Sequence, residues 1–244
     1  SKQHRLYTGW QQIMKNKLKY LIGSLVIAAS GSANALDIDL FSTDQAVLEQ
    51  TTIGTTLSNT TGGGVDPTMV GGARDLQSIC SANCTTATNR RSKLLVENGA
   101  LSFINDPTVV AQAQVQWDGN ADSATPGVVD YTGLGSLNLL AEGSAFLVET
   151  LFSDLGFFFT ITVYTSETVF TTITFVSSDV QVPESSTIPF SGFQGNCGFL
   201  NPDPANLPPI GVVSVNCGAG GPAQMDNVGA IVLALNVTGQ AAID

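Results

Sequence analysis

Apolar and polar side chains alternate along several stretches of the chain. In residues 111–117, two alanines, a valine and a tryptophan share one face and three glutamines share the other, which indicates a half-buried strand. Residues 157–165 and 168–177 also alternate, with aromatic residues on both faces. The short link Ser166-Glu167 predicts that these two strands form an antiparallel hairpin at the centre of a sheet. We expect one face of the hairpin to be buried and the other to be partly covered.

A second hairpin is predicted around Asn98-Gly99, which lies between the alternating segments 92–97 and 100–104. Asn-Gly supplies the two positive φ angles of a type I′ turn, the turn that joins adjacent antiparallel strands. Three further stretches have the composition of strands: residues 145–152, 212–215 and 228–237.

Helical signals are weak after residue 35. The best candidate is residues 42–49, where Ser42 and Gln45 form a capping box, but this segment is short and is equally compatible with a strand. Many short strands separated by turns predict an all-β fold, an antiparallel β-sandwich or jelly roll that forms one domain over residues 36–244. Residues 59–72 and 195–222 are rich in glycine, and the second is also rich in proline, so both are predicted to be loops.

The N-terminal region has the order of a signal peptide. Residues 14–35 contain a basic stretch, an apolar run of about ten residues and the sequence Ala33-Asn34-Ala35. The apolar run is shorter than the roughly 20 residues that a transmembrane helix needs, so we expect cleavage after Ala35 and export. Residues 1–13 precede Met14 and are interpreted as translated upstream sequence. The last residues, 241–244, are compatible with the beginning of another strand.

Charge changes strongly along the chain. Four basic and 20 acidic residues follow residue 35, a formal net charge of −16 for that part. Such a surface repels nucleic acids and anionic membranes and is compatible with divalent cations. The only histidine, His4, precedes Met14, so residues 36–244 can contain no histidine-based triad, metal site or pH switch. Lys93 is the only lysine in that part, and nothing around it indicates Schiff-base chemistry.

All four cysteines follow the predicted signal peptide, and their even number indicates disulfide bonds. The pairs Cys80–Cys84 and Cys197–Cys217 are favoured because each brackets a local loop. The second pair closes a loop of about 20 residues, which is worth ~3 kcal/mol in the chain-entropy model. A zinc site is the alternative, but the spacing and an oxidising compartment disfavour it.

Two acidic clusters could bind a cation. Asp118, Asn120 and Asp122 place oxygen atoms at alternate positions, as at the start of a calcium-binding loop. The rest of that motif is missing, and an acidic turn between strands explains the same residues. In the second cluster, period two puts Asp37 and Asp39 on one face of a strand, which we interpret as a solvated face.

Carbohydrate recognition requires exposed aromatic rings beside polar groups. Trp117, Tyr131 and Tyr164 are the candidates, although Trp117 lies on the apolar face of its strand and is more simply a core residue. Glycoside hydrolysis requires two carboxylates about 5–10 Å apart in a cleft, and nothing in the sequence pairs any two. The motifs of serine hydrolases, nucleotide-binding proteins and zinc proteases do not occur.

Four segments, residues 36–45, 71–76, 115–119 and 227–231, resemble a poorly characterised set of bacterial secreted proteins that often end in a PEP-CTERM sorting tail. That tail does not occur in this sequence, since Pro183-Glu184-Ser185 lies mid-chain without the apolar and basic segments that would follow it. The resemblance implies export to the envelope or extracellular matrix of a bacterium and implies no reaction.

The sequence therefore favours a non-enzymatic protein of the cell surface or extracellular matrix, with a structural or adhesive role. A calcium-assisted carbohydrate-binding module is the second hypothesis, and a glycoside hydrolase that uses acidic residues alone is the third. Polysaccharides and other matrix components are the expected partners. Residues 228–244 could also mediate self-association if they form an open edge strand.

Overall fold

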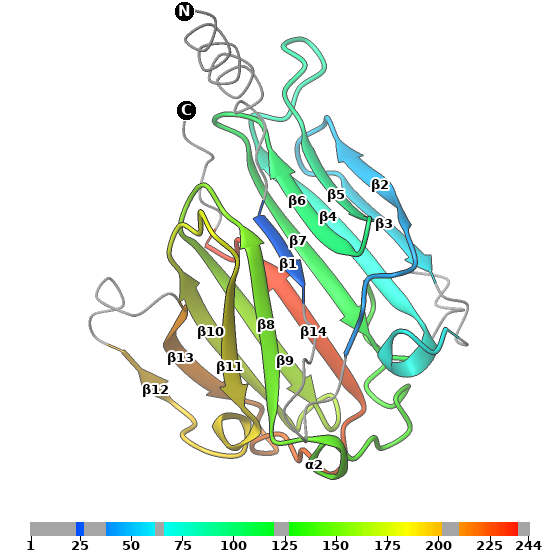
Figure 1. Ribbon diagram of the computed structural model, residues 1–244, viewed down its shortest axis with the longest axis vertical. Helices are drawn as coiled ribbons and strands as arrows, with labels where there is room; N and C mark the ends of the chain where they lie inside the picture. The colour runs from blue at the N-terminus through cyan, green and yellow to red at the C-terminus, as the bar shows by residue number, and fades with distance from the viewer. Residues whose placement is uncertain (1–22, 27–37, 62–65, 120–126, 202–209, 239–244) are drawn as a thin grey trace, which may run out of the picture.

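The computed structural model is a sandwich of two antiparallel sheets (Figure 1) and describes residues 23–26, 38–61, 66–119, 127–201 and 210–238. The all-β prediction is confirmed. Among the described residues the helical elements are short: α2 (Leu139–Glu142), the 3-10 turn η1 (Val70–Gly72) and the 3-10 turn η2 (Phe190–Phe193).

The smaller sheet has six strands. Their spatial order is β11 (Glu184–Pro189), β8 (Ala145–Phe152), β1 (Gly23–Val26), β6 (Ala100–Asn105), β5 (Ser92–Glu97) and β2 (Gln45–Gln50). The larger sheet has eight strands. Their order is β12 (Phe199–Leu200), β13 (Ile210–Cys217), β10 (Phe170–Ser177), β9 (Phe157–Tyr164), β14 (Ala230–Leu235), β7 (Val110–Trp117), β4 (Arg74–Ala82) and β3 (Thr56–Thr61).

The hydrophobic core lies between the two sheets and follows the alternation in the sequence. In β9 the side chains of Phe159, Ile161 and Val163 are buried, and Phe159 stacks on Phe175 of β10 with ring centroids 5.0 Å apart. Residues on the opposite face of these strands are mostly half-buried. Burial of one face with partial cover of the other is therefore confirmed, as is the antiparallel pairing of β9 with β10.

Both predicted hairpins form. β5 pairs with β6 from Ser92↔Asn105 to Glu97↔Ala100, and Asn98 and Gly99 between them have φ angles of 54° and 76°. A side chain tolerates these left-handed values poorly, and asparagine and glycine tolerate them best. The segment 42–49, compatible with helix or strand, contributes to strand β2.

Two of the predicted loops are partly wrong. Strand β3 includes Asn59–Thr61, and strands β12 and β13 lie inside residues 195–222. The prolines of the latter segment are concentrated in residues 202–209, which lie outside the described residues. Residues 210–217 contain no proline. Five of them are apolar or β-branched, a composition typical of a strand.

Strand β14 is not an edge strand. It pairs with β7 on one side and with β9 on the other, so its backbone N–H and C=O groups are already used within the sheet. Edge-to-edge pairing with another chain through residues 230–235 is therefore blocked, and the prediction of an open edge strand there is wrong. Residues 239–244 lie outside the described part of the chain.

Strand β1 comes from the predicted signal peptide. Residues 23–26 lie between β6 and β8 and are antiparallel to both, so these two strands share no ladder of their own and are joined through β1. The rest of residues 14–35 lies outside the described residues, and cleavage after Ala35 stays a prediction. Within the described ranges, none of the helices has both the length and the apolar character of a membrane span.

Both favoured disulfide bonds are present. Cys80 and Cys84 are joined with their Cα atoms 6.3 Å apart, and Cys197 and Cys217 with their Cα atoms 5.4 Å apart. The first bond shapes the turn that follows β4, and the second ties the segment before β12 to the end of β13. These cysteines are thus disulfide-bonded rather than ligands of zinc.

Candidate functional site

A buried polar network lies at one end of the sandwich and is built around Arg74. The guanidinium group of Arg74 donates two hydrogen bonds to the carboxylate of Asp39, at 3.0 and 2.8 Å, and a third to Gln45 Oε1 at 2.8 Å. The indole N–H of Trp117 donates to the same carboxylate at 2.8 Å. Arg74, Asp39 and Trp117 are fully buried, so this network is an internal tie between the N-terminal segment and the large sheet.

The interpretation of Asp37 and Asp39 as a solvated face is wrong for Asp39. The chain is not a regular strand here: Asp39 makes a single bridge to Met69, Phe41 has a φ of 50°, and Leu40 is exposed while Ile38 is buried. Period two therefore does not apply. Burial of the carboxylate is tolerated because cationic and N–H donors surround it. Asp37 lies outside the described residues.

Three of the four segments that carry the family resemblance meet at this network. Asp39 comes from residues 36–45, Arg74 from 71–76 and Trp117 from 115–119. The glycine of the fourth segment, Gly229, packs so closely against the backbone of residue 131 that an added Cβ atom would lie 1.8 Å from its carbonyl oxygen. The described parts of these segments therefore contribute to folding and packing.

The predicted calcium loop is only partly described. Asp118 is 2% exposed, and one of its carboxylate oxygens accepts a hydrogen bond from the backbone N–H of Asp130 at 2.8 Å. Asn120 and Asp122 lie outside the described residues, and the described part of the chain contains no group of three or more metal-binding side chains. Asp118 thus has a structural role in closing the turn, and calcium binding stays a prediction.

A row of buried polar side chains crosses the large sheet beside Asp118. Thr60, Asp75 and Gln116 are cross-strand neighbours on β3, β4 and β7, and the Thr60 hydroxyl, both Asp75 carboxylate oxygens and the Gln116 amide have no hydrogen-bond partner. Burial raises the pKa of Asp75 to about 6. The Thr60 hydroxyl acts in the opposite direction and lowers this pKa, and the charge of Asp118 raises it. Gln116, which was predicted to lie on the polar face of its strand, is buried.

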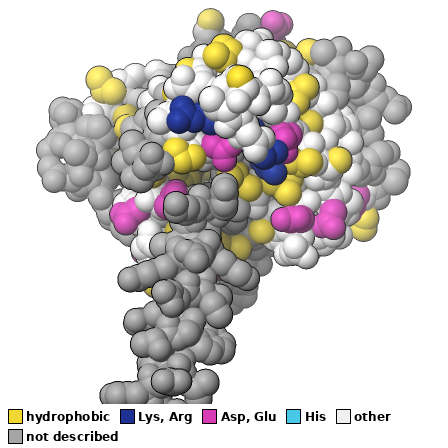
Figure 2. Space-filling view, turned by 90° about the horizontal axis from the view of Figure 1, so that it is seen from above, with side chains coloured by type: hydrophobic (Ala, Val, Ile, Leu, Met, Phe, Trp, Pro, Cys, Tyr) yellow, Lys and Arg dark blue, Asp and Glu magenta, His cyan; other side chains and the backbone are white. Residues whose placement is uncertain are grey.

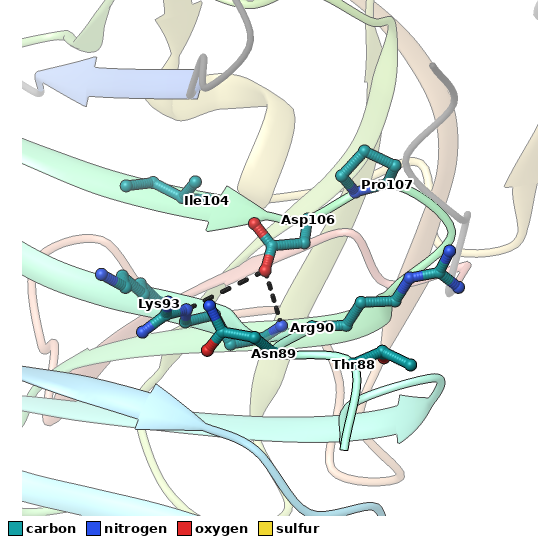
Figure 3. Close-up of a pocket in the computed structure, with 8 residues that line it drawn as sticks. Thr88, Asn89, Arg90, Lys93, Ile104, Asp106 and Pro107 are labelled. Carbon is teal, nitrogen blue, oxygen red and sulfur yellow. Dashed lines mark hydrogen bonds and ion pairs between the residues drawn. The ribbon is translucent and has the colours of Figure 1, made fainter. Parts of the chain in front are cut away.

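A groove with a volume of about 460 Å³, which we call the basic groove, lies on the surface of the described residues (Figure 3). It lies between the turn that precedes β5 and the end of β6. Its walls are formed by two basic side chains on the rim, a third on β5, and neighbouring polar and apolar residues. The lining residues are Thr88, Asn89, Arg90, Arg91, Lys93, Ile104, Asp106 and Pro107.

The basic groove contains three of the four basic residues that follow residue 35. The fourth, Arg74, is buried in the internal network, so Arg90, Arg91 and Lys93 are the cations of this part that reach solvent. Seen from above, Lys and Arg side chains form two patches on one face of the molecule, with acidic side chains between and beside them (Figure 2). The groove is thus a local exception on a strongly acidic chain.

Two carboxylates partly neutralise these cations. Arg91 pairs with Glu49 at 2.7 Å, Lys93 pairs with the same carboxylate at 3.2 Å, and Asp106 lies 4.0 Å from Arg91. The hydrogen bond from Arg91 and the neighbouring Lys93 charge lower the pKa of Glu49. Arg90 instead donates to the Thr108 hydroxyl at 2.8 Å and makes no ion pair with the described residues. Its charge is therefore available to a ligand.

The turn that holds Arg90 is firmly anchored. Thr85 and Arg90 exchange backbone hydrogen bonds of 2.9 and 3.0 Å, and the Cys80–Cys84 disulfide lies at the base of the turn. The carboxylate of Asp106 accepts a 2.8 Å hydrogen bond from the backbone N–H of Arg91. The groove is consequently preformed, which reduces the entropy lost on binding a ligand.

The sequence contained a signal for this groove. Arg90-Arg91-Ser92-Lys93 is the only basic run after residue 35, a part of the chain whose net charge is strongly negative. The Asp106 carboxylate in the groove faces Arg91 and accepts a hydrogen bond from the Arg91 backbone N–H. Of the predicted aromatic platforms, Trp117 is a core residue, whereas Tyr131 and Tyr164 are half-buried and pack together with ring centroids 5.0 Å apart.

Comparison with known proteins adds no assignment: the chain matches no protein-family model, no curated protein and no solved structure.

Proposed function

We propose that the protein is a non-enzymatic module of the cell surface or extracellular matrix that binds a carboxylate-bearing polysaccharide in the basic groove. The observation that carries this proposal is the position of Arg90, Arg91 and Lys93 in one preformed groove on an otherwise acidic chain. Guanidinium and ammonium groups bind carboxylates by charge-assisted hydrogen bonds.

The composition of the groove suits a sugar acid. Glu49 and Asp106 leave only a small positive excess, which matches a single carboxylate. Asn89 and Thr88 add amide and hydroxyl groups that suit the hydroxyls of a sugar. An uronic acid unit presents one carboxylate and several hydroxyls, which matches this mixture.

Binding of polygalacturonate to the full chain, measured by isothermal titration calorimetry, tests the proposal. We expect binding at 50 mM NaCl that weakens at 300 mM NaCl, because added salt screens the attraction between charges. The double variant Arg90→Ala, Lys93→Ala should bind about tenfold more weakly, a loss of ~1.4 kcal/mol. Uncharged dextran should not compete.

A matched control separates the groove from total charge. Ser185→Asp with Thr187→Asp changes the net charge by the same amount at exposed positions of β11. Strand β11 is at the edge of the smaller sheet, and β8 and β1 separate it from β6 and the groove. This control should retain wild-type affinity. Equal weakening by both double variants, or no binding of polygalacturonate at 50 mM NaCl, would overturn the proposal.

A further inference from the structure

Five neighbouring strands of the large sheet carry no acidic or basic side chain. Strands β7, β14, β9, β10 and β13 are adjacent in the sheet and together comprise 38 residues without Asp, Glu, Lys, Arg or His. Soluble domains usually have about a quarter or more of their surface residues charged, and this chain has 20 acids to distribute. The absence of charge over five strands indicates a surface that contacts something neutral.

The outer face of these strands, which we call the neutral face, has hydroxyl and amide groups at its centre. Apolar side chains lie at its two ends, where Phe158 is opposite Val176 and Tyr164 is opposite Phe170. One cross-strand row contains Thr162 and Thr172, whose hydroxyls are 2.9 Å apart. The next row contains Gln114, Thr160 and Thr174, all half-buried. These positions face away from the core, because the alternate residues of the same strands fill it.

The neutral face has an aromatic cluster at one end and a shallow groove at the other. At one end, Tyr164 lies between Tyr131 and Phe170, with ring centroids at 5.0 and 5.3 Å. At the other end, a shallow groove of about 140 Å³ runs along β4, β7 and β14, lined by Gln77, Ile79, Gln112, Ala113, Gln114, Ala234, Leu235 and Val237. Half-buried rings at one end and amides along a groove at the other suit a ligand that extends across the strands.

We propose that the neutral face binds an uncharged, extended polysaccharide. Sugar hydroxyls can exchange hydrogen bonds with the threonine and glutamine side chains, and the apolar face of a sugar ring can contact Tyr164. An anionic polymer would gain nothing from a face without cations. A second copy of the chain is the less favourable occupant. Stable protein interfaces have an apolar core, whereas the central rows of this face, Thr162 with Thr172 and Thr160 with Thr174, are polar.

Affinity electrophoresis of the full chain in gels containing laminarin or hydroxyethylcellulose, both uncharged, tests the proposal. We expect retardation by at least one of the two polymers, with a dissociation constant that 0.5 M NaCl leaves unchanged. Thr160→Glu with Thr174→Glu should weaken binding at least tenfold, because each carboxylate would have to be desolvated against the sugar. The same substitutions at Ser185 and Thr187 of β11 should have no effect.

The single variant Gln114→Glu keeps the test decisive if the double variant does not fold, because it preserves shape and adds one charge at a half-exposed position. It too should weaken binding, whereas Arg90→Ala with Lys93→Ala should not, so failure of the neutral face and failure of the basic groove are distinguishable. No retardation by either polymer would overturn the proposal. Sedimentation that shows a dimer dissociated by Gln114→Glu would overturn it in favour of a second copy.

Discussion

Arg74 and Asp75 are neighbours in β4, and the structure provides hydrogen-bond partners for the side chain of only one of them, Arg74. The side chain of Arg74 points to the inner face, where Asp39, Gln45 and the Thr43 carbonyl oxygen accept its hydrogen bonds. Asp75 points to the outer face, where it is 2% exposed and has no hydrogen-bond partner. One residue of displacement in a strand thus separates a compensated buried charge from an uncompensated one.

The buried Asp75 carboxyl should make stability depend on pH. Its pKa is raised from 3.8 to about 6, so the native state binds more protons than the unfolded state between these values. The free energy of unfolding therefore falls as the pH rises through this window. We expect Asp75→Asn to stabilise the protein by about 1–3 kcal/mol at pH 7.5 and to have little effect below pH ~4.

Urea unfolding of the wild type and Asp75→Asn at several pH values measures this difference. Asp226→Asn, which removes an exposed carboxylate, is the control and should show no such pH-dependent gain. A variant that is destabilised more at pH 7.5 than at pH 4 would contradict the prediction and would mean that the Asp75 carboxylate has a favourable native partner when ionised.

Strand β1 is the element that the predicted cleavage after Ala35 would affect most. It provides the ladder partners of Leu101 and Phe103 on one side and of Thr150 and Phe152 on the other. The cleavage site predicted after Ala35 follows this strand, so cleavage there would remove an interior strand from the smaller sheet.

We therefore expect a chain that begins at Leu36 to unfold at a lower temperature than the full chain. The backbone amides of residues 101–103 and 149–152 should exchange with deuterium faster, because they lose inter-strand hydrogen bonds. Strand β5, which pairs with β2 and β6, provides internal reference amides that should change less. Equal protection of all these amides in both chains would contradict the prediction and would mean that β6 and β8 pair directly after removal of β1.

The whole molecule carries a net charge of −11, concentrated outside the five strands of the neutral face. Repulsion among acidic side chains destabilises a compact state and is screened by salt over a distance of about 10 Å at 0.1 M. We expect the melting temperature of the full chain to rise by about 2–5 °C between 10 mM and 300 mM NaCl. EDTA in both buffers excludes a contribution from calcium, and choline chloride should act like NaCl. A melting temperature that falls with salt would show that favourable ion pairs dominate.

The fold class and most strands could be predicted from the sequence, because they depend on local patterns. Period-two alternation in residues 111–117 and 157–165 identifies the buried face of each strand whatever its neighbours are. Asn98-Gly99 fixes a hairpin through backbone conformation alone, and short loops between cysteines favoured the observed disulfides. Each of these signals lies within about 20 residues of sequence.

Only the tertiary structure decided how distant segments meet. Asp39 and Trp117 are 78 residues apart in sequence, and the fate of the Asp39 carboxylate depends on finding Arg74 and that indole in the same buried place. Whether β14 is an edge strand depends on its pairing with β7 and β9, and the neutral face exists only because five uncharged strands are adjacent. The alternation of side chains along a strand is determined by the residues themselves, whereas the order of strands and the partners of buried charges are set by packing between residues far apart in the chain.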